Sequence, residues 1–254
     1  MSSVQWDHTV HYVNNLDAVI AQLSQYGIRA FHGGTHPRWG TCNALSYFGL
    51  AYHEFLAIEN LSLAQQTDRD NLVVHDAVQA LPDHQVLSRV ALRTTDIVSV
   101  YYRLKQQGIE VAPIITGKRL DKQGRPVEWK MMTPGGSFQG LRYPFIIEWQ
   151  ETDEQRLEHL HQQGIIQPHP AGEVALSAAE FEVENPHATA RRWSALFDLP
   201  MTTRAGNPAL RIGDKYFQFN QGNSNALVQL DFLTDTAALK GQTIWVGEGR
   251  YAFH

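Results

Sequence analysis

The sequence predicts an α+β fold built from a repeated unit of one strand, one helix and three further strands (βαβββ). Two segments place apolar residues at helical spacing and end at a glycine, Gly27 and Gly108. Each follows a strand-like segment and precedes further strand-like segments. The two copies begin about 80 residues apart, and a third, less regular copy follows. Because twisted strands of paired modules curl together, we expect a half-barrel sheet beside a third module.

The first two modules are expected to share one domain over residues 1–151. Residues 5–60 contain the strand WDHTVHYV, the helix LDAVIAQLSQYG, and the strands IRAFHGG, NALSYFG and AYHEFLAIE. Residues 86–151 repeat the order with VLSRVALRTTD, the helix IVSVYYRLKQQG, and the strands IEVAPII, VEWKMMTP and YPFIIEWQ. Both helices therefore lie between a first strand and three later ones.

A helical linker is expected over residues 152–171, where DEQRLEHLHQQG is rich in charge and a Pro/His/Gly segment follows. The third βαβββ-like module is expected over residues 172–254, with AEFEVEN, the helix HATARRWSALFDLP, and the strands ALRIG, KYFQFN and ALVQLDFL. Ala178 stands there where the first module has His8. We therefore expect this module to be a scaffold, an interface or a lid, and the apolar strand ALVQLDFL makes a homodimer an expectation.

Composition favours a small-molecule partner. The chain has 254 residues and a net charge of −5 without a Lys/Arg cluster, so neither nucleic acid nor an anionic membrane is expected to bind. No apolar run approaches the roughly 18 residues of a membrane span, and the first residues do not resemble a signal peptide, so we expect a cytoplasmic protein. Cys42 is the single cysteine, which excludes an internal disulfide and a cysteine-based metal site.

Three side chains are candidates for one site in the cleft between the modules. His8 lies on the first strand of the first module, Glu54 on its fourth strand, and Glu148 on the fourth strand of the second module. A charge such as Glu148 amid apolar neighbours needs a partner. An imidazole with carboxylates is a common ligand set for a divalent cation such as Zn, Fe, Mn, Co or Ni. A buried network of salt bridges is the competing interpretation.

The sequence resembles the vicinal oxygen chelate superfamily, and within it the glyoxalase-like group. In that group a His-bearing strand is followed by a G-x-H-x-x-x-G-T-x-N loop and a Tyr-x-Glu strand. The corresponding segments here are DHTVHYV, GGTHPRWGTCN and AYHEFL, and PFIIEW closes the second module. The residues at family spacing in the loop are Gly34, His36, Gly40, Thr41 and Asn43.

This resemblance implies a small oxygen-bearing substrate and, in metal-using members, ligands at His8, Glu54 and Glu148. With one divalent metal, Glu148 or Glu54 would move protons in lyase or isomerase chemistry. His36, Asn43 and Trp39 are candidate substrate contacts, although turn capping explains the first two about equally well and Trp39 is more typical of a cleft wall. A dioxygenase is less favoured, because it needs a second histidine at the site.

Arg89 stands at the fourth ligand position that the resemblance implies, and a guanidinium cannot bind a metal. Two interpretations remain open. Either a metal is held by the other three residues and Arg89 contacts the substrate, or Arg89 replaces the metal and pairs with Glu54 and Glu148. The second interpretation predicts a protein that binds or sequesters a small molecule without a metal.

Overall fold

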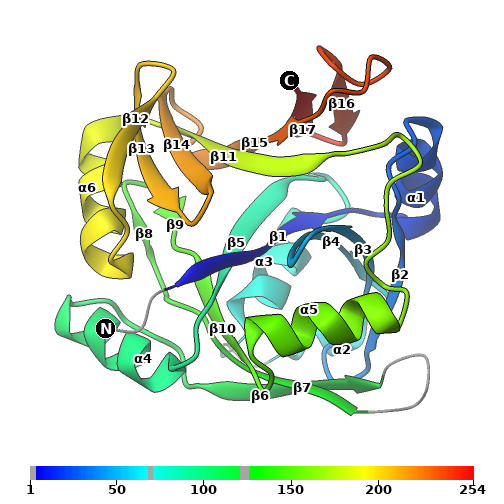
Figure 1. Cartoon of the computed structure of the whole chain (residues 1–254). Coiled ribbons are helices and arrows are strands. Elements are labelled where there is room, and N and C mark those ends of the chain that lie inside the picture. The colour runs from blue at the N-terminus through cyan, green and yellow to red at the C-terminus, as the bar shows by residue number, and fades with distance from the viewer. Residues whose placement is uncertain (1–3, 68–70, 121–125) are drawn as a thin grey trace.

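The computed structural model describes residues 4–67, 71–120 and 126–254. The fold is α+β and consists mainly of two curled sheets, one from each half of the chain (Figure 1). The first sheet has eight strands in the order β2-β3-β4-β1-β5-β10-β7-β6. Its strands are β1 (Gln5–Tyr12), β2 (Phe31–His36), β3 (Thr41–Phe48), β4 (Ala51–Ile58), β5 (Leu87–Arg93), β6 (Ile115–Leu120), β7 (Pro126–Met132) and β10 (Phe145–Trp149).

The two predicted modules join at the centre of this sheet, where β1 and β5 are antiparallel. The last strand of each module then pairs in parallel with its first strand, β4 with β1 and β10 with β5. Each module also has its helix, α1 (Leu16–Gln25) or α4 (Ile97–Gln106), and these helices begin at the capping residues Asn15 and Asp96. The paired modules therefore form one curled sheet, as predicted.

Two short helices between the modules were not predicted from the sequence. These are α2 (Leu61–Gln65) and α3 (Leu72–Ala80). Figure 1 shows α3, in cyan, inside the curl of the first sheet. Its Val73, Val74 and Ala77 pack with Tyr12 and Ala91 of the sheet. The insertion therefore fills part of the concave side.

The second sheet has seven strands in the order β12-β13-β14-β11-β15-β17-β16. Along the chain, its first strand is β11 (Ala175–Val183), which is followed by the helix α6 (Pro186–Phe197). The remaining strands are β12 (Met201–Arg204), β13 (Asn207–Ile212), β14 (Lys215–Gln221), β15 (Ala226–Leu233), β16 (Thr243–Val246) and β17 (Gly249–Phe253).

The C-terminal half thus repeats the pattern of the first sheet more closely than the sequence indicated. The segment ALVQLDFL was expected to be the last strand of the third module. Instead it forms β15, which is antiparallel to β11 as β5 is to β1, and β17 then pairs in parallel with β15. β15 therefore starts a shortened fourth unit, in which turns take the place of the helix between β15 and β16. The division of the chain into domains stays a prediction.

The segment between the sheets contains the helix α5 (Asp153–Gln162), which begins at a capping box formed by Thr152 and Gln155. Its Leu160 packs on Tyr47 and Tyr52 of the first sheet. A small hairpin of β8 (Ser137–Phe138) and β9 (Leu141–Arg142) precedes β10. Among the residues that the structure describes, no helix is long and apolar enough to cross a membrane.

Candidate ligand-binding pocket

The concave side of the first sheet contains a pocket with about 670 Å³ of space between protein atoms, its mouth included. Most of the lining is apolar or aromatic, and the helix α3 contributes Val73 and Val74. The aromatic side chains that line the pocket are Trp39, Tyr47, Tyr52, Trp129, Phe145 and Trp149.

A bulge in β1 shapes the polar end of the pocket. Trp6 pairs with Leu92 and His8 with Ala91, so Asp7 is an extra residue in β1. Neighbouring side chains of a regular strand point to opposite faces, and a bulge can redirect one of them. Here Asp7 Oδ1 lies 2.6 Å from His8 Nδ1. Both side chains are buried, and the bulge therefore pairs two residues that are adjacent in the sequence.

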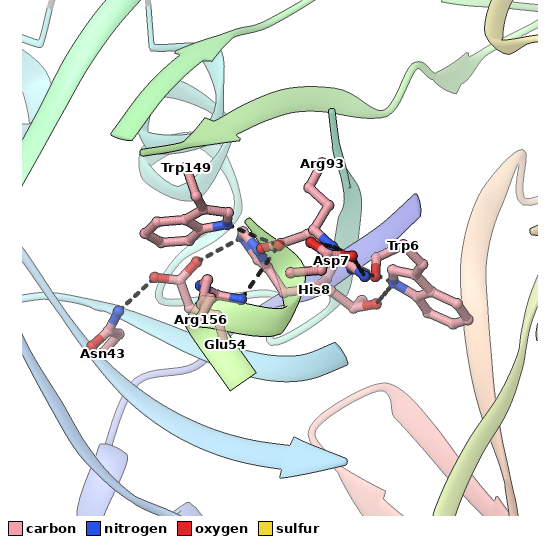
Figure 2. Close-up of polar contacts among 10 residues, drawn as sticks. Trp6, Asp7, His8, Asn43, Glu54, Arg93, Trp149 and Arg156 are labelled. Carbon is pink, nitrogen blue, oxygen red and sulfur yellow. Dashed lines mark hydrogen bonds and ion pairs between the residues drawn. The ribbon is translucent and has the colours of Figure 1, made fainter. Parts of the chain in front are cut away.

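Glu54 is the carboxylate that faces the pocket. Its Oε2 lies 3.5 Å from His8 Nε2, and its Oε1 accepts a 2.6 Å hydrogen bond from Asn43 Nδ2 (Figure 2). Tyr52, two residues earlier on β4, stacks on the His8 ring with centroids 4.6 Å apart. The His8 ring is thus held by Asp7, Tyr52 and Glu54.

The electrostatics of this group favour a charged pair. Burial alone would lower the pKa of His8, but the hydrogen bonds and charges of Asp7 and Glu54 raise it to about 9. Burial would raise the pKa of Glu54, but the contacts with His8, His36 and Asn43 lower it to about 2. At neutral pH the pocket therefore presents an imidazolium paired with a carboxylate.

The linker helix α5 contributes a second cation to this group. The guanidinium of Arg156 lies over the Trp149 ring, 4.1 Å from its centroid, and its Nη1 is 3.8 Å from Asp7 Oδ2. Trp149 Nε1 donates a 2.9 Å hydrogen bond to the same oxygen. The ion pairs drawn in Figure 2 link four side chains of alternating charge, which we call the charged row: Arg156, Asp7, His8 and Glu54.

The structure brings five of the predicted site residues to this pocket. His8 and Glu54 form its polar end, and Asn43 holds Glu54. His36 and Trp39 line the wall, and His36 Nδ1 lies 3.1 Å from the Thr41 hydroxyl.

Glu148 is not part of the pocket, and the expectation that it converges with His8 and Glu54 is wrong. On β10 the residues that line the pocket are Phe145, Ile147 and Trp149. Because side chains alternate along a strand, the Glu148 side chain points to the opposite face of the sheet. There it accepts a hydrogen bond of 2.8 Å from the backbone N–H of Ile97 and pairs with Lys130. Its carboxylate binds the first N–H of helix α4, where a negative charge is favoured.

Arg89 does not pair with Glu54 or Glu148, so the interpretation that it replaces a metal between them is also wrong. Its Nε donates a 2.9 Å hydrogen bond to Asp76 of α3, and its Nη1 donates to the carbonyl oxygens of Pro134 and Tyr143. Arg89 fixes the helix that fills the concave side.

The position equivalent to His8 is Ala91. His8 and Ala91 face each other across the β1–β5 pair, with Tyr52 beside the first and Phe145 beside the second. By the same correspondence Ile147 takes the place of Glu54. Leu16, the start of α1, follows His8 by eight residues, whereas Ile97, the start of α4, follows Ala91 by only six. An alignment of the two modules by their helix starts therefore places Arg89, and not Ala91, level with His8.

The donors at the pocket do not fit a divalent metal centre. Such a centre takes three or four protein donors, whereas the second module places the side chains of Ala91 and Ile147, which have no lone pairs, at its two equivalent positions. Within residues 4–67, 71–120 and 126–254, no three His, Cys, Asp or Glu side chains are grouped as metal ligands. His8 Nε2 is also directed at a carboxylate, which makes it a donor.

Asp7 and Arg156 were missed as members of the site. The bulge that redirects Asp7 leaves no mark in the alternation of apolar residues, although an acidic residue directly before His8 was visible in the sequence. Arg156 lies in a charged segment that the sequence predicts to be a linker, and a single buried residue on a polar helix gives no periodic signal.

The geometry of two paired βαβββ modules around a pocket on the concave side of their sheet defines a glyoxalase-like protein. A model of the glyoxalase-like domain matches residues 6–197, and the chain belongs to this family. No curated protein matches the chain.

Two solved structures share the fold over most of the chain. A hypothetical protein from Staphylococcus aureus is 23% identical, covers 99% of both chains and superposes with a TM-score of 0.85. A mutant of 4-hydroxymandelate synthase from Streptomyces coelicolor is 14% identical, covers 92% of this chain and 72% of its own, and has a TM-score of 0.57. At these identities the likeness shows the fold alone.

Proposed function

We propose that the protein binds a small aromatic molecule whose hydroxyl group donates a hydrogen bond to Glu54. The observation that carries this proposal is one carboxylate at the polar end of a pocket whose walls include three indole rings. A carboxylate can accept about four hydrogen bonds, and Asn43 and His8 account for two of these positions. Flat aromatic walls favour a flat aromatic ligand.

The charge of the site supports a neutral ligand. Within the charged row, Arg156 and His8 carry two positive charges, and Asp7 and Glu54 carry two negative charges. A cationic or anionic ligand would therefore leave an uncompensated charge in a largely apolar pocket. A hydroxyl group supplies the donor that Glu54 lacks without adding charge.

Binding is better supported than the lyase or isomerase chemistry that the family resemblance implied. A carboxylate whose pKa is held near 2 is a weak base, and it gives little driving force for removing a proton from carbon. The donor set also lacks the residues that would hold a metal beside a substrate oxygen. We therefore assign Glu54 the role of a recognition group.

The test compares naphthol with naphthalene, which lacks the hydroxyl group, by calorimetry. The parent protein should bind naphthol about tenfold or more tightly, because a hydrogen bond to a charged group contributes about 1.5–3 kcal/mol. Glu54→Gln should remove most of this preference while binding naphthalene unchanged. Glu148→Gln is the matched control, since the same substitution lies outside the pocket. Equal affinities in the parent, or a preference that survives in Glu54→Gln, would contradict the proposal.

A separate prediction concerns metal content. Protein purified without chelator should contain far less than one equivalent of Zn, Fe, Mn, Co or Ni, because the second module offers Ala91 and Ile147 in place of ligands. Naphthol binding should also be unaffected by EDTA. The measurement is elemental analysis of the parent and of His8→Ala. Stoichiometric metal that is lost in the variant would show that the pocket is a metal centre.

A further inference from the structure

Arg156 is an unusual residue on the helix α5. Its neighbours Glu154, Gln155 and Glu158 are exposed, whereas the Arg156 side chain is 7% exposed. Its Nη1 is buried and has no hydrogen-bond partner among the described residues. Burying a guanidinium is costly unless a charge compensates it. The position of this side chain therefore needs an explanation beyond helix formation.

Arg156 contacts the residues that hold His8. It lies over Trp149, which lines the pocket, and near Asp7, which binds His8 Nδ1. Its distance to the Tyr52 ring, which stacks on His8, is 5.8 Å. One side chain from the linker thus lies near Asp7 and Tyr52, which hold the imidazole, and over Trp149, which donates to Asp7.

Anchoring of α5 does not explain Arg156, because another pair already provides it. Asp153, at the start of the helix, accepts hydrogen bonds of 2.7 to 3.0 Å from Nε and Nη2 of Arg93 on β5. A planar two-point contact of this kind is geometrically specific. By contrast, the 3.8 Å contact between Arg156 and Asp7 is an unbonded charge pair.

We propose that Arg156 is a positioning residue of the pocket, which holds Asp7 and Trp149 so that the His8 imidazole faces Glu54. This inference rests on the proposed function, because it concerns the recognition of a hydroxyl group by Glu54. Without the guanidinium, the charged row would carry two negative charges against one positive charge. Asp7 would then lose the cation beside its carboxylate, and Trp149 would lose the guanidinium that lies over its ring.

The test uses three variants of the full chain. Arg156→Met keeps most of the packing against Trp149 and removes the charge, and Arg156→Lys keeps the charge. Asp153→Asn weakens the anchor of α5 and keeps all four side chains of the charged row, although it removes a charge that acts on Arg156. Arg156→Met should weaken naphthol binding about tenfold and naphthalene binding less than twofold, and Arg156→Lys should restore part of the naphthol preference. Asp153→Asn should lower the melting temperature but retain the preference.

A second measurement without ligand separates this inference from the proposed function. The indole N–H proton of Trp149, which donates to Asp7, gives an NMR signal that should shift in Arg156→Met and stay in place in Asp153→Asn. If the parent does not prefer naphthol, the proposed function fails while this shift still tests the positioning role. An unchanged Trp149 signal in Arg156→Met, or equal losses of preference in Arg156→Met and Asp153→Asn, would overturn the inference.

Discussion

Arg89→Met is expected to lower the free energy of unfolding by about 3 kcal/mol, because removing one partner of a buried ion pair leaves the other charge uncompensated. Arg89 and Asp76 are both largely buried, and the Arg89 Nη1 also donates to two carbonyl oxygens. Arg142, 3.5 Å from the same Asp76 oxygen, is half-exposed and compensates in part. The measurement is urea unfolding at neutral pH.

Two comparisons make this result specific to the pair. Arg191→Met, the same substitution at an exposed position of α6, should change stability by less than about 0.5 kcal/mol. Adding Asp76→Leu to Arg89→Met should recover much of the loss, since apolar residues of similar volume often replace a buried pair at little cost. A loss below about 1 kcal/mol in Arg89→Met would show that Arg142 and water satisfy Asp76.

This role of Arg89 shows where sequence reasoning reached its limit. Alternation along a strand and the Tyr-x-Glu spacing placed His8 and Glu54 on facing inward positions, and in the structure both line the pocket. The second module was matched through its helix, which assumes connections of equal length. The shorter connection after β5 moves the equivalent position by two residues, from Arg89 to Ala91.

Glu148 was misplaced for a related reason. The segment FIIEW is apolar at every residue except the glutamate, so alternation does not reveal which face is inward. The likeness to Glu54 then selected the wrong residue by one position, and a shift of one residue reverses the face. Conversely, the curled sheet was predictable, because its helices and strands have strong periodic patterns that tolerate such errors.

The contacts missed altogether depend on tertiary structure. The bulge at Asp7 is visible only in the pairing of β1 with β5, and the burial of Arg156 follows from where α5 lies against the first sheet. The sequence does contain an N-cap residue for α3, Asn71, whose side chain accepts a hydrogen bond from the backbone N–H of Val74. The βαβββ pattern has no helix at that point, so the pattern does not predict α3.

Mild acid is expected to destabilise the protein through His11, which lies between the two sheets. Its Nδ1 is in hydrogen-bond contact with the Tyr251 hydroxyl of β17, and its Nε2 is 3.3 Å from the Gln85 carbonyl oxygen. Burial lowers the pKa of His11 from 6.5 to about 4, because the charged form is disfavoured there. The histidine is therefore neutral in the folded protein at neutral pH.

The sign of the effect follows from proton uptake. The unfolded chain takes up a proton at His11 near pH 6.5, whereas the folded protein does so only near pH 4. Stability from this residue is therefore fully present above pH 6.5 and is lost as the pH falls toward 4. Between pH 7 and pH 5 the loss from His11 is about 2 kcal/mol. Burial also lowers the pKa of His53, which contacts the Tyr251 ring, so its contribution has the same sign.

The experiment measures urea unfolding at pH 7 and pH 5 in the parent and in His11→Gln, which cannot take up a proton. His8 contributes in the opposite direction, because its pKa is raised and its stabilisation is fully present below pH 6.5. The His8 contribution is the same in the parent and in His11→Gln, so it cancels when the two are compared. Between pH 7 and pH 5, the parent should therefore lose about 2 kcal/mol more of its free energy of unfolding than His11→Gln. His84→Gln, at an exposed position, should behave as the parent does. If His11→Gln shows the same loss as the parent, the acid sensitivity comes from elsewhere than the junction between the sheets.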